Sequence, residues 1–187
     1  MSLYDAPRPA TNSASALTPP QAPPSWTHTP AALLAATKDA IAVSRTLHDR
    51  IAALPPASCS VSSVIHPLAA AAAVLTATTE PLSFYKNVAP DRALRDASNE
   101  AEGLLREFSV DASMRVDVFE AVRAAAEAAE KSAEPLDAEE KRLIEKMLLD
   151  GKRAGLALPE AERKELLEVR AWRHYCMDIC ANAGTLS

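Results

Sequence analysis

The fold is decided by residues 81–122, which read PLSFYKNVAPDRALRDASNEAEGLLREFSVDASMRVDVFEAV. Ala89, Pro90 and Asp91 predict the start of a helix whose apolar positions fall at steps of three and four, at Leu94, Ala97, Ala101, Leu104 and Phe108. Asp111, followed by Ser113, is a candidate N-cap for the next helix, which carries Val118, Val122, Ala125 and Ala129. The stretch therefore predicts two successive helices, each with an apolar side to bury against other helices.

Two more helices are predicted on the N-terminal side. Thr29 and Pro30 start the first, because a hydroxyl caps free amides and proline at the first helical position loses no hydrogen bond. Pro55-Pro56 end it. An alanine-rich segment over residues 60–78 forms the second, which tolerates Pro67 best near its start and which Pro81 is expected to end.

Two further helices are predicted on the C-terminal side. Pro135 closes the helix that follows Asp111, and Asp137 with Glu140 three residues later has the layout of a capping box. Gly155 is expected to end this fifth helix, and Leu158-Pro159 to start a sixth. We expect about six helices packed as an antiparallel layer or bundle.

Composition also favours an all-α fold. The four glycines and the long alanine-rich stretches with interleaved charges fit helices, because alanine costs a helix least and glycine loosens it. With 187 residues, 48% of them hydrophobic, the chain can bury one core, so a single globular domain is expected.

By composition the chain divides into three parts. Residues 1–28 are rich in Pro, Ser and Ala, and their closely spaced prolines predict a disordered arm that acts as a linker, with a polyproline ligand as the alternative. Residues 29–170 form the helical domain. Residues 171–187, AWRHYCMDICANAGTLS, are interpreted as a divergent tail of the kind that a gene-model error produces, with genuine splice variation as the alternative.

Charge and hydropathy exclude several partner classes. The net charge of −5 and the pI near 5.4 argue against nucleic acid, which needs clustered Lys and Arg facing phosphates. The longest apolar run, residues 67–75, is shorter than the roughly 20 residues that cross a bilayer, so no membrane partner is expected. The N-terminus has no signal-peptide core, so the cytoplasm is the expected compartment, and Cys59, Cys176 and Cys180 are expected to be free thiols.

Four collinear pieces resemble the N-terminal helical region of the thimet oligopeptidase family of zinc metalloendopeptidases, which includes neurolysin and the saccharolysins. They are LHDRIAAL at 47–54, SFYKNVAPDRALRDASNEAEGLL at 83–105, SMRVDVFEAV at 113–122 and LIEKMLLDGKRAGLALPEAERKEL at 143–166. The NV-x-PD-x-ALRDAS and K-x-LLD-x-KR-x-GL-x-LP blocks are the specific parts. The resemblance covers about residues 30–170.

The resemblance implies that this segment forms one wall of a deep channel that admits only short, unstructured peptides. In the family, zinc lies on an H-E-x-x-H helix far downstream; this chain has no such motif, and its four His cannot supply the paired ligands that zinc needs. No catalytic, cofactor-binding or metal-ligating residue is therefore predicted here. Zinc and short peptides belong to the full-length family, and the missing catalytic domain is the implied partner.

The chain is accordingly expected to be truncated before the zinc site and to be inactive alone. The alternative function is a non-enzymatic helical binding module, which would hold a partner on helix faces that the missing part leaves exposed.

Several side chains are candidates for isolated sites. His48 fits a surface or half-buried histidine and His66 a boundary residue better than a ligand, and His28 lies in the flexible arm. His174, Cys176 and Cys180 could bridge a metal ion on a helix, but burial on an apolar stripe is favoured, because structural zinc takes four ligands. Cys59 has no partner that resembles a Cys-His nucleophile system.

Charged residues of the decisive stretch have two interpretations. Asp91, Asp96, Glu100 and Glu102 fall mostly off the apolar stripe, as residues of a solvated face do, and channel lining is the alternative. Tyr85, Arg92 and Arg95 could similarly face a peptide.

Overall fold

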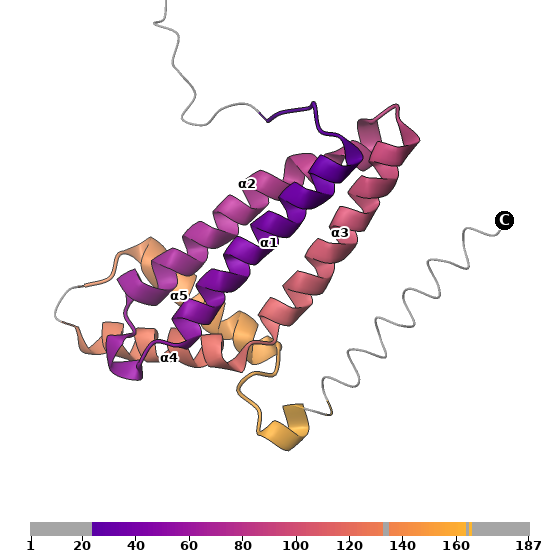
Figure 1. Cartoon of the computed structure of the whole chain (residues 1–187). Helices are drawn as coiled ribbons and strands as arrows, with labels where there is room; N and C mark the ends of the chain where they lie inside the picture. The colour runs from indigo at the N-terminus through magenta and orange to yellow at the C-terminus, as the bar shows by residue number, and fades with distance from the viewer. Residues whose placement is uncertain (1–23, 133–134, 164, 166–187) are drawn as a thin grey trace, which may run out of the picture.

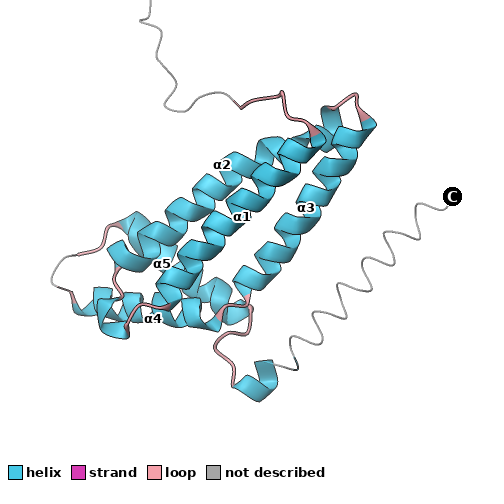
Figure 2. Cartoon of the chain, in the orientation of Figure 1, coloured by secondary structure: helices cyan, strands magenta, loops and turns pink. Residues whose placement is uncertain are grey.

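All regular secondary structure in the described residues is helical. The computed structural model describes residues 24–132, 135–163 and 165. Within them no β-strand occurs, and the α-helices, cyan in Figure 2, are α1 (Pro30–Ala52), α2 (His66–Val88), α3 (Arg92–Ser113), α4 (Val116–Lys131) and α5 (Ala138–Arg153). A 3₁₀ turn at Pro56–Ser58 and a π turn at Val61–Ile65 connect α1 to α2. The predicted all-α class is confirmed.

The predicted sixth helix begins where the sequence placed it. Residues 160–163 and 165 are helical, and the Arg163 N–H donates to the carbonyl of Pro159 at 3.0 Å. The remainder of that helix and the divergent tail lie outside the described residues.

The three longest helices, α1, α2 and α3, lie side by side as an elongated bundle (Figure 1). Only residues 89–91 separate α2 from α3, so the chain reverses sharply between them. α4 crosses the end of the bundle where α1 ends and α2 begins, and α5 packs against α4 (Figure 1).

Apolar clusters hold the two ends of the bundle. Where α4 crosses, the buried side chains come from the π turn and all helices except α3, and include Ile51, Val64, Ile65, Leu68, Val118, Val122 and Ile144. At the far end, a second cluster contains Leu33 of α1, Leu82 and Tyr85 of α2, and Ala101 of α3. The same bundle buries the hydroxyl side chains of Thr37, Ser44, Thr79 and Ser98. These small side chains let the helices approach closely.

Three helices begin where the sequence predicts, each with a side-chain cap. The side chains of Thr29 and Asp91 each accept a hydrogen bond from an amide of the following turn, at 3.2 and 3.1 Å. Asp137 and Glu140 form the predicted capping box, with reciprocal bonds of 2.7 and 3.1 Å. Gly155 follows the end of α5 with a φ of 84°, a left-handed conformation that favours glycine.

Pro81 does not end the second helix as predicted, because α2 continues through it to Val88. A proline inside a helix removes one backbone hydrogen bond and costs about 3 kcal/mol. The buried Ser98 of α3 lies against the turn that follows: its hydroxyl donates to the carbonyls of Leu82 and Ser83, at 2.7 and 3.1 Å, and accepts from the Lys86 N–H at 3.1 Å. A contact from another helix therefore supports α2 beyond the proline.

The prediction that Asp111 caps a fourth helix is also wrong. α3 runs on to Ser113, and α4 begins at Val116 after the N-cap Arg115. The carboxylate of Asp111 instead contacts Arg45 of α1 at 3.3 Å, an ion pair across the bundle. The predicted apolar side of α4 is nevertheless confirmed at Val118, Val122 and Ala125, which are buried.

The helical stretch Val61–Val88 is long and apolar enough, with a mean hydropathy of 1.5, to cross a membrane by length and composition alone. The sequence analysis did not predict it, because the longest uninterrupted apolar run, residues 67–75, is too short to cross a bilayer. Length and composition do not separate a membrane span from a helix of a packed domain, and here Leu68, Leu82 and Tyr85 pack into the bundle. Only 17% of the apolar window is buried, however, so α2 presents much small apolar surface outward.

Two glycine substitutions test the packing of α4 and α5. In Gly151→Ala, a new Cβ overlaps ring carbons of Phe119 on α4, so we expect a loss of about 1–3 kcal/mol in the free energy of unfolding. In the control Gly103→Ala on α3, the new Cβ meets nothing within 4 Å, and the better helix former should add about 0.5–1 kcal/mol. Urea unfolding measures both; equal effects of the two changes would contradict this packing.

A serine substitution tests the support of the proline-containing helix. Ser98→Ala leaves backbone groups of α2 without a buried hydroxyl partner, and should lower the free energy of unfolding by about 1–3 kcal/mol. The control Ser113→Ala removes an exposed hydroxyl that bonds within its own helix, and should change stability by less than about 0.5 kcal/mol. Thermal unfolding followed by circular dichroism compares the two; indistinguishable curves would refute the role of Ser98.

Candidate functional site

The most specific sequence block, NV-x-PD-x-ALRDAS, forms the corner between α2 and α3. Asp91 caps α3, and the Arg95 guanidinium donates to the carbonyls of Ala89 and Pro90, both at 2.8 Å. Ser98 completes the corner by bonding to the backbone of α2. Asp91, Arg95 and Ser98 of this block therefore all form hydrogen bonds to backbone groups, so the block encodes a structural corner.

Tyr85, a candidate peptide-facing residue, is 4% exposed and lies under the segment that precedes α1. Its hydroxyl lies 3.1 Å from Nδ1 of His28, and the Trp26 ring packs edge-on against the Tyr85 ring with centroids 5.4 Å apart. Trp26 and His28, which the sequence analysis assigned to the arm, therefore contact the end of α2. Trp26 also contacts Phe84, at 6.0 Å between centroids.

A groove of about 470 Å³ runs between α2 and α3 on the outer surface of the bundle. Its lining combines the ring of Phe84, 49% exposed, with the charged side chains of Glu80, Lys86, Glu102 and Arg106. The Lys86 ammonium and the Glu102 carboxylate form an ion pair across the two helices at 2.5 Å. We call the groove lined by Glu80, Phe84, Lys86, Glu102 and Arg106 the α2–α3 groove.

The predicted carboxylate and arginine candidates separate in the structure. Glu102 lines the α2–α3 groove, whereas Asp91 is a helix cap and Arg95 holds the corner. Arg92 and Asp96 form an exposed ion pair at 3.6 Å, four residues apart on α3, and Glu100 is exposed. The sequence reading missed Phe84 and Lys86, because no spacing within α2 shows that α3 lies beside them.

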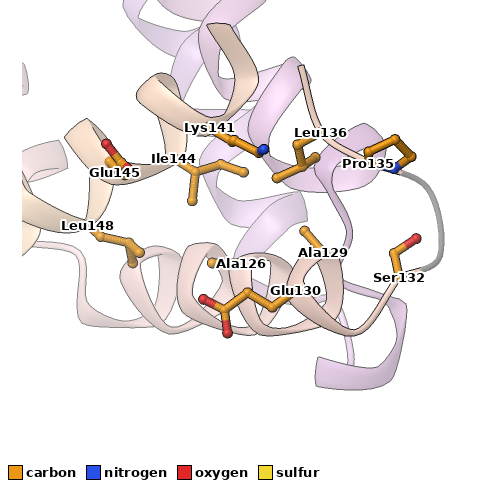
Figure 3. A pocket seen from close by; sticks show the side chains of 10 residues that line it. All are labelled: Ala126, Ala129, Glu130, Ser132, Pro135, Leu136, Lys141, Ile144, Glu145 and Leu148. Carbon is orange, nitrogen blue, oxygen red and sulfur yellow. The ribbon is translucent and has the colours of Figure 1, made fainter. Parts of the chain in front are cut away.

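A second hollow lies between the end of α4 and the start of α5 (Figure 3). It measures about 360 Å³, and Ala126, Ala129, Ile144 and Leu148 give it apolar walls. The charged residues Glu130, Lys141 and Glu145 lie around it, with the two glutamates on opposite sides. No cysteine, histidine or tyrosine is among its lining side chains, and we assign it no chemistry.

His48 lies half-buried near the junction of α3 and α4, where its ring is 6.0 Å from that of Phe108. Burial lowers the pKa of His48, and the Arg115 guanidinium lowers it further. Arg115 itself joins Asp49 of α1 to Asp117 of α4, at 2.5 and 2.7 Å, and this contact holds the pKa of Asp117 below its usual range. The two contacts of Arg115 tie α1 to α4, and His48 lies half-buried beside them.

Among the described residues, the other histidine and cysteine candidates, His66 and Cys59, make contacts within the helical packing. Nε2 of His66 lies 3.0 Å from the Glu140 carboxylate that belongs to the capping box of α5, and this pair links α2 to α5. Cys59 is buried with its thiol 3.6 Å from the Pro55 carbonyl. In the part of the chain that the structure describes, no three His, Cys, Asp or Glu side chains converge as metal ligands would. His174, Cys176 and Cys180 lie outside that part.

The chain is similar in sequence to parts of two longer proteins. No protein-family model matches the chain. Saccharolysin of Saccharomyces cerevisiae is 29% identical over 151 residues, which make up 81% of this chain and 21% of the relative. A thimet-like oligopeptidase of Dictyostelium discoideum is 33% identical over 89 residues, 47% of this chain and 13% of the relative. The chain therefore spans about a fifth, or less, of the length of these curated relatives.

The lowered pKa of His48 predicts a pH dependence of stability. Because the folded state resists protonation of His48 and the unfolded state does not, stability is highest above the ordinary pKa of 6.5 and falls as the pH drops through and below it. In His48→Gln, the free energy of unfolding should fall less between about pH 8 and about pH 5 than in the wild type. Urea titrations at several pH values measure this; identical pH slopes would contradict it.

Proposed function

This chain belongs to the thimet oligopeptidase family, and from this premise we propose that it supplies a helical wall beside the peptide path of a peptidase. The relatives are peptidases of that family. The chemistry of peptide hydrolysis is assigned to residues outside these 187, and the chain alone is proposed to be inactive.

The extent of the similarity to saccharolysin carries this proposal. A match over 151 of the 187 residues leaves at most 36 of them outside, so it includes residues 37–151. That range contains α2, α3 and α4 whole and most of α1 and α5. The similarity therefore extends over the packed helical unit, and it supports a shared structural role for that unit.

The α2–α3 groove is the surface that we assign to the peptide. Phe84 offers an exposed ring to a peptide side chain, while Lys86, Glu102 and Arg106 offer donors and acceptors for backbone groups. Such a mixture of apolar surface with a few polar groups is typical of ligand sites. The name of the Dictyostelium relative, an oligopeptidase, supports short peptides as the substrate class.

Zinc, which the family resemblance implies, is proposed to be held elsewhere in the family protein. The described residues do not fit it, because they bring no three potential ligands together. The cytoplasm remains our proposal for the compartment, on the ground of the cysteine pattern and the N-terminal sequence.

A second candidate function is a non-enzymatic helical binding module. The outer surface of α1 and α2 favours it, because Val43 and Val74 are 68% and 61% exposed there. Exposed apolar patches tend to mark partner surfaces.

The proposal predicts where peptidase activity is found. The 187-residue chain should not cleave short fluorogenic peptides with added zinc, whereas a chimera that carries residues 37–151 in place of the matching part of yeast saccharolysin should cleave them. Within the chimera, Phe84→Ala should raise KM by about threefold or more, because it removes contact surface for the peptide.

Val88→Ala is the matched control for this experiment. Val88 is 52% exposed on the same helix but does not line the α2–α3 groove, so KM should stay unchanged. Cleavage by the chain alone, or a folded chimera without activity, would contradict the wall function.

A further inference from the structure

A second outer groove, between α1 and α2, is almost wholly apolar. It measures about 240 Å³, and its apolar lining comes from Ala36, Ala40 and Val43 on α1 and from Ala71, Val74 and Leu75 on α2. Asp39, Ser44 and Thr78 complete the lining, and Asp39 is the one charged residue among them. We call these residues the α1–α2 groove. The exposed fractions of Val43 and Val74, 68% and 61%, show that nothing in the described structure covers it.

Helix α2 borders both grooves, but the lining of the α1–α2 groove differs from that of the α2–α3 groove. In the α2–α3 groove, Glu80, Lys86, Glu102 and Arg106 make the surface compatible with water. The α1–α2 groove has no such set of charges, although it faces outward from the same bundle. A surface of this composition resembles an uncovered helix interface.

The spacing of the lining fits one further helix. The lining positions are 36, 39, 40, 43 and 44 on α1 and 71, 74, 75 and 78 on α2, and their steps of three and one keep each set on a single face of its helix. Alanines at the bottom let another helix approach closely, with larger side chains inserted between the two rows. An amphipathic helix laid into a groove uses this arrangement.

We propose that the α1–α2 groove receives one amphipathic helix from the part of a thimet oligopeptidase that has no counterpart in these 187 residues. Most of the groove, from Ala40 through Leu75, lies within the stretch matched to saccharolysin, of whose length the match covers only 21%. Ample chain to cover the groove therefore exists in that relative. The inference rests on the proposed function, because it takes this segment to be one wall of a larger enzyme.

Two other occupants fit the observations less well. A second copy of the chain would need about 800 Å² on each partner for a stable dimer, far more than a groove with two exposed valines provides. A lipid surface attracts helices with basic residues beside their apolar face, and no Lys or Arg lines this groove.

Thiol labelling tests the proposal. With Cys176 and Cys180 changed to Ser, Val43→Cys and Val74→Cys should label rapidly in the 187-residue chain, because both positions are exposed. In the saccharolysin chimera, the same cysteines should label about tenfold or more slowly. Intact yeast saccharolysin with cysteines at the two aligned positions gives the same readout without depending on the folding of the chimera.

A groove-filling variant provides the matched comparison. Ala71→Trp places an indole in the groove, and should abolish the protection of Val43→Cys in the chimera while the helical content of the isolated chain stays unchanged. Ala70→Trp, exposed on the same helix outside the groove, should leave the protection intact.

Rapid labelling in both the chimera and intact saccharolysin overturns the proposal. It is equally overturned if the isolated chain is a dimer whose thiols are protected, which identifies a second copy, or if neutral phosphatidylcholine vesicles protect them, which identifies a lipid surface. Peptide cleavage measured on the same chimera keeps the two proposals apart. Protection without cleavage refutes the wall function alone, and cleavage without protection refutes the docked helix alone.

Discussion

The buried hydroxyl of Ser98 is the contact on which the arrangement of α2 depends. It bonds to three backbone groups of α2 in the turn that follows Pro81, a residue that cannot donate a helical hydrogen bond. Because α2 continues as one helix, its start can pack beneath α4 while its end reaches Tyr85 and the cluster at the far end of the bundle. An end at Pro81 would detach Phe84 and Lys86 from the face that they share with α3.

The features that sequence predicted correctly are those decided within one helical turn. The cap at Thr29, the helix start at Asp91 and the box of Asp137 with Glu140 involve partners two or three residues apart, so the spacing alone contains the interaction. The predictions at Pro81 and Asp111 are wrong for the opposite reason. The helix that contains Pro81 is held by Ser98 of α3. Asp111 contacts Arg45 of α1, which lies 66 residues away in the chain. Tertiary partners at such separations leave no periodic signal in the sequence.

The candidate site illustrates a related limit. The residues that make the corner block specific, Asp91, Arg95 and Ser98, bind backbone groups, and a motif with such exact demands is compatible with a purely structural role. Tyr85 and Arg95 could be judged as peptide contacts only after the bundle showed one buried and the other bonded to carbonyls. Phe84, one residue from Tyr85, lies on the exposed side. Which neighbour faces outward is set by the rotation of α2 against α1 and α3.

α2 also explains how one bundle can have two unlike outer surfaces. Residues 61–79 contain no Asp, Glu, Lys or Arg, and Glu80 is the first of these on the helix. The α1–α2 groove uses residues before this change, from Ala71 to Thr78, whereas the α2–α3 groove uses residues from Glu80 to Asn87. The change of composition at Glu80 therefore divides α2 into an uncharged half that borders the α1–α2 groove and a charged half that borders the α2–α3 groove. Because the helix crosses Pro81 unbroken, one element carries both surfaces.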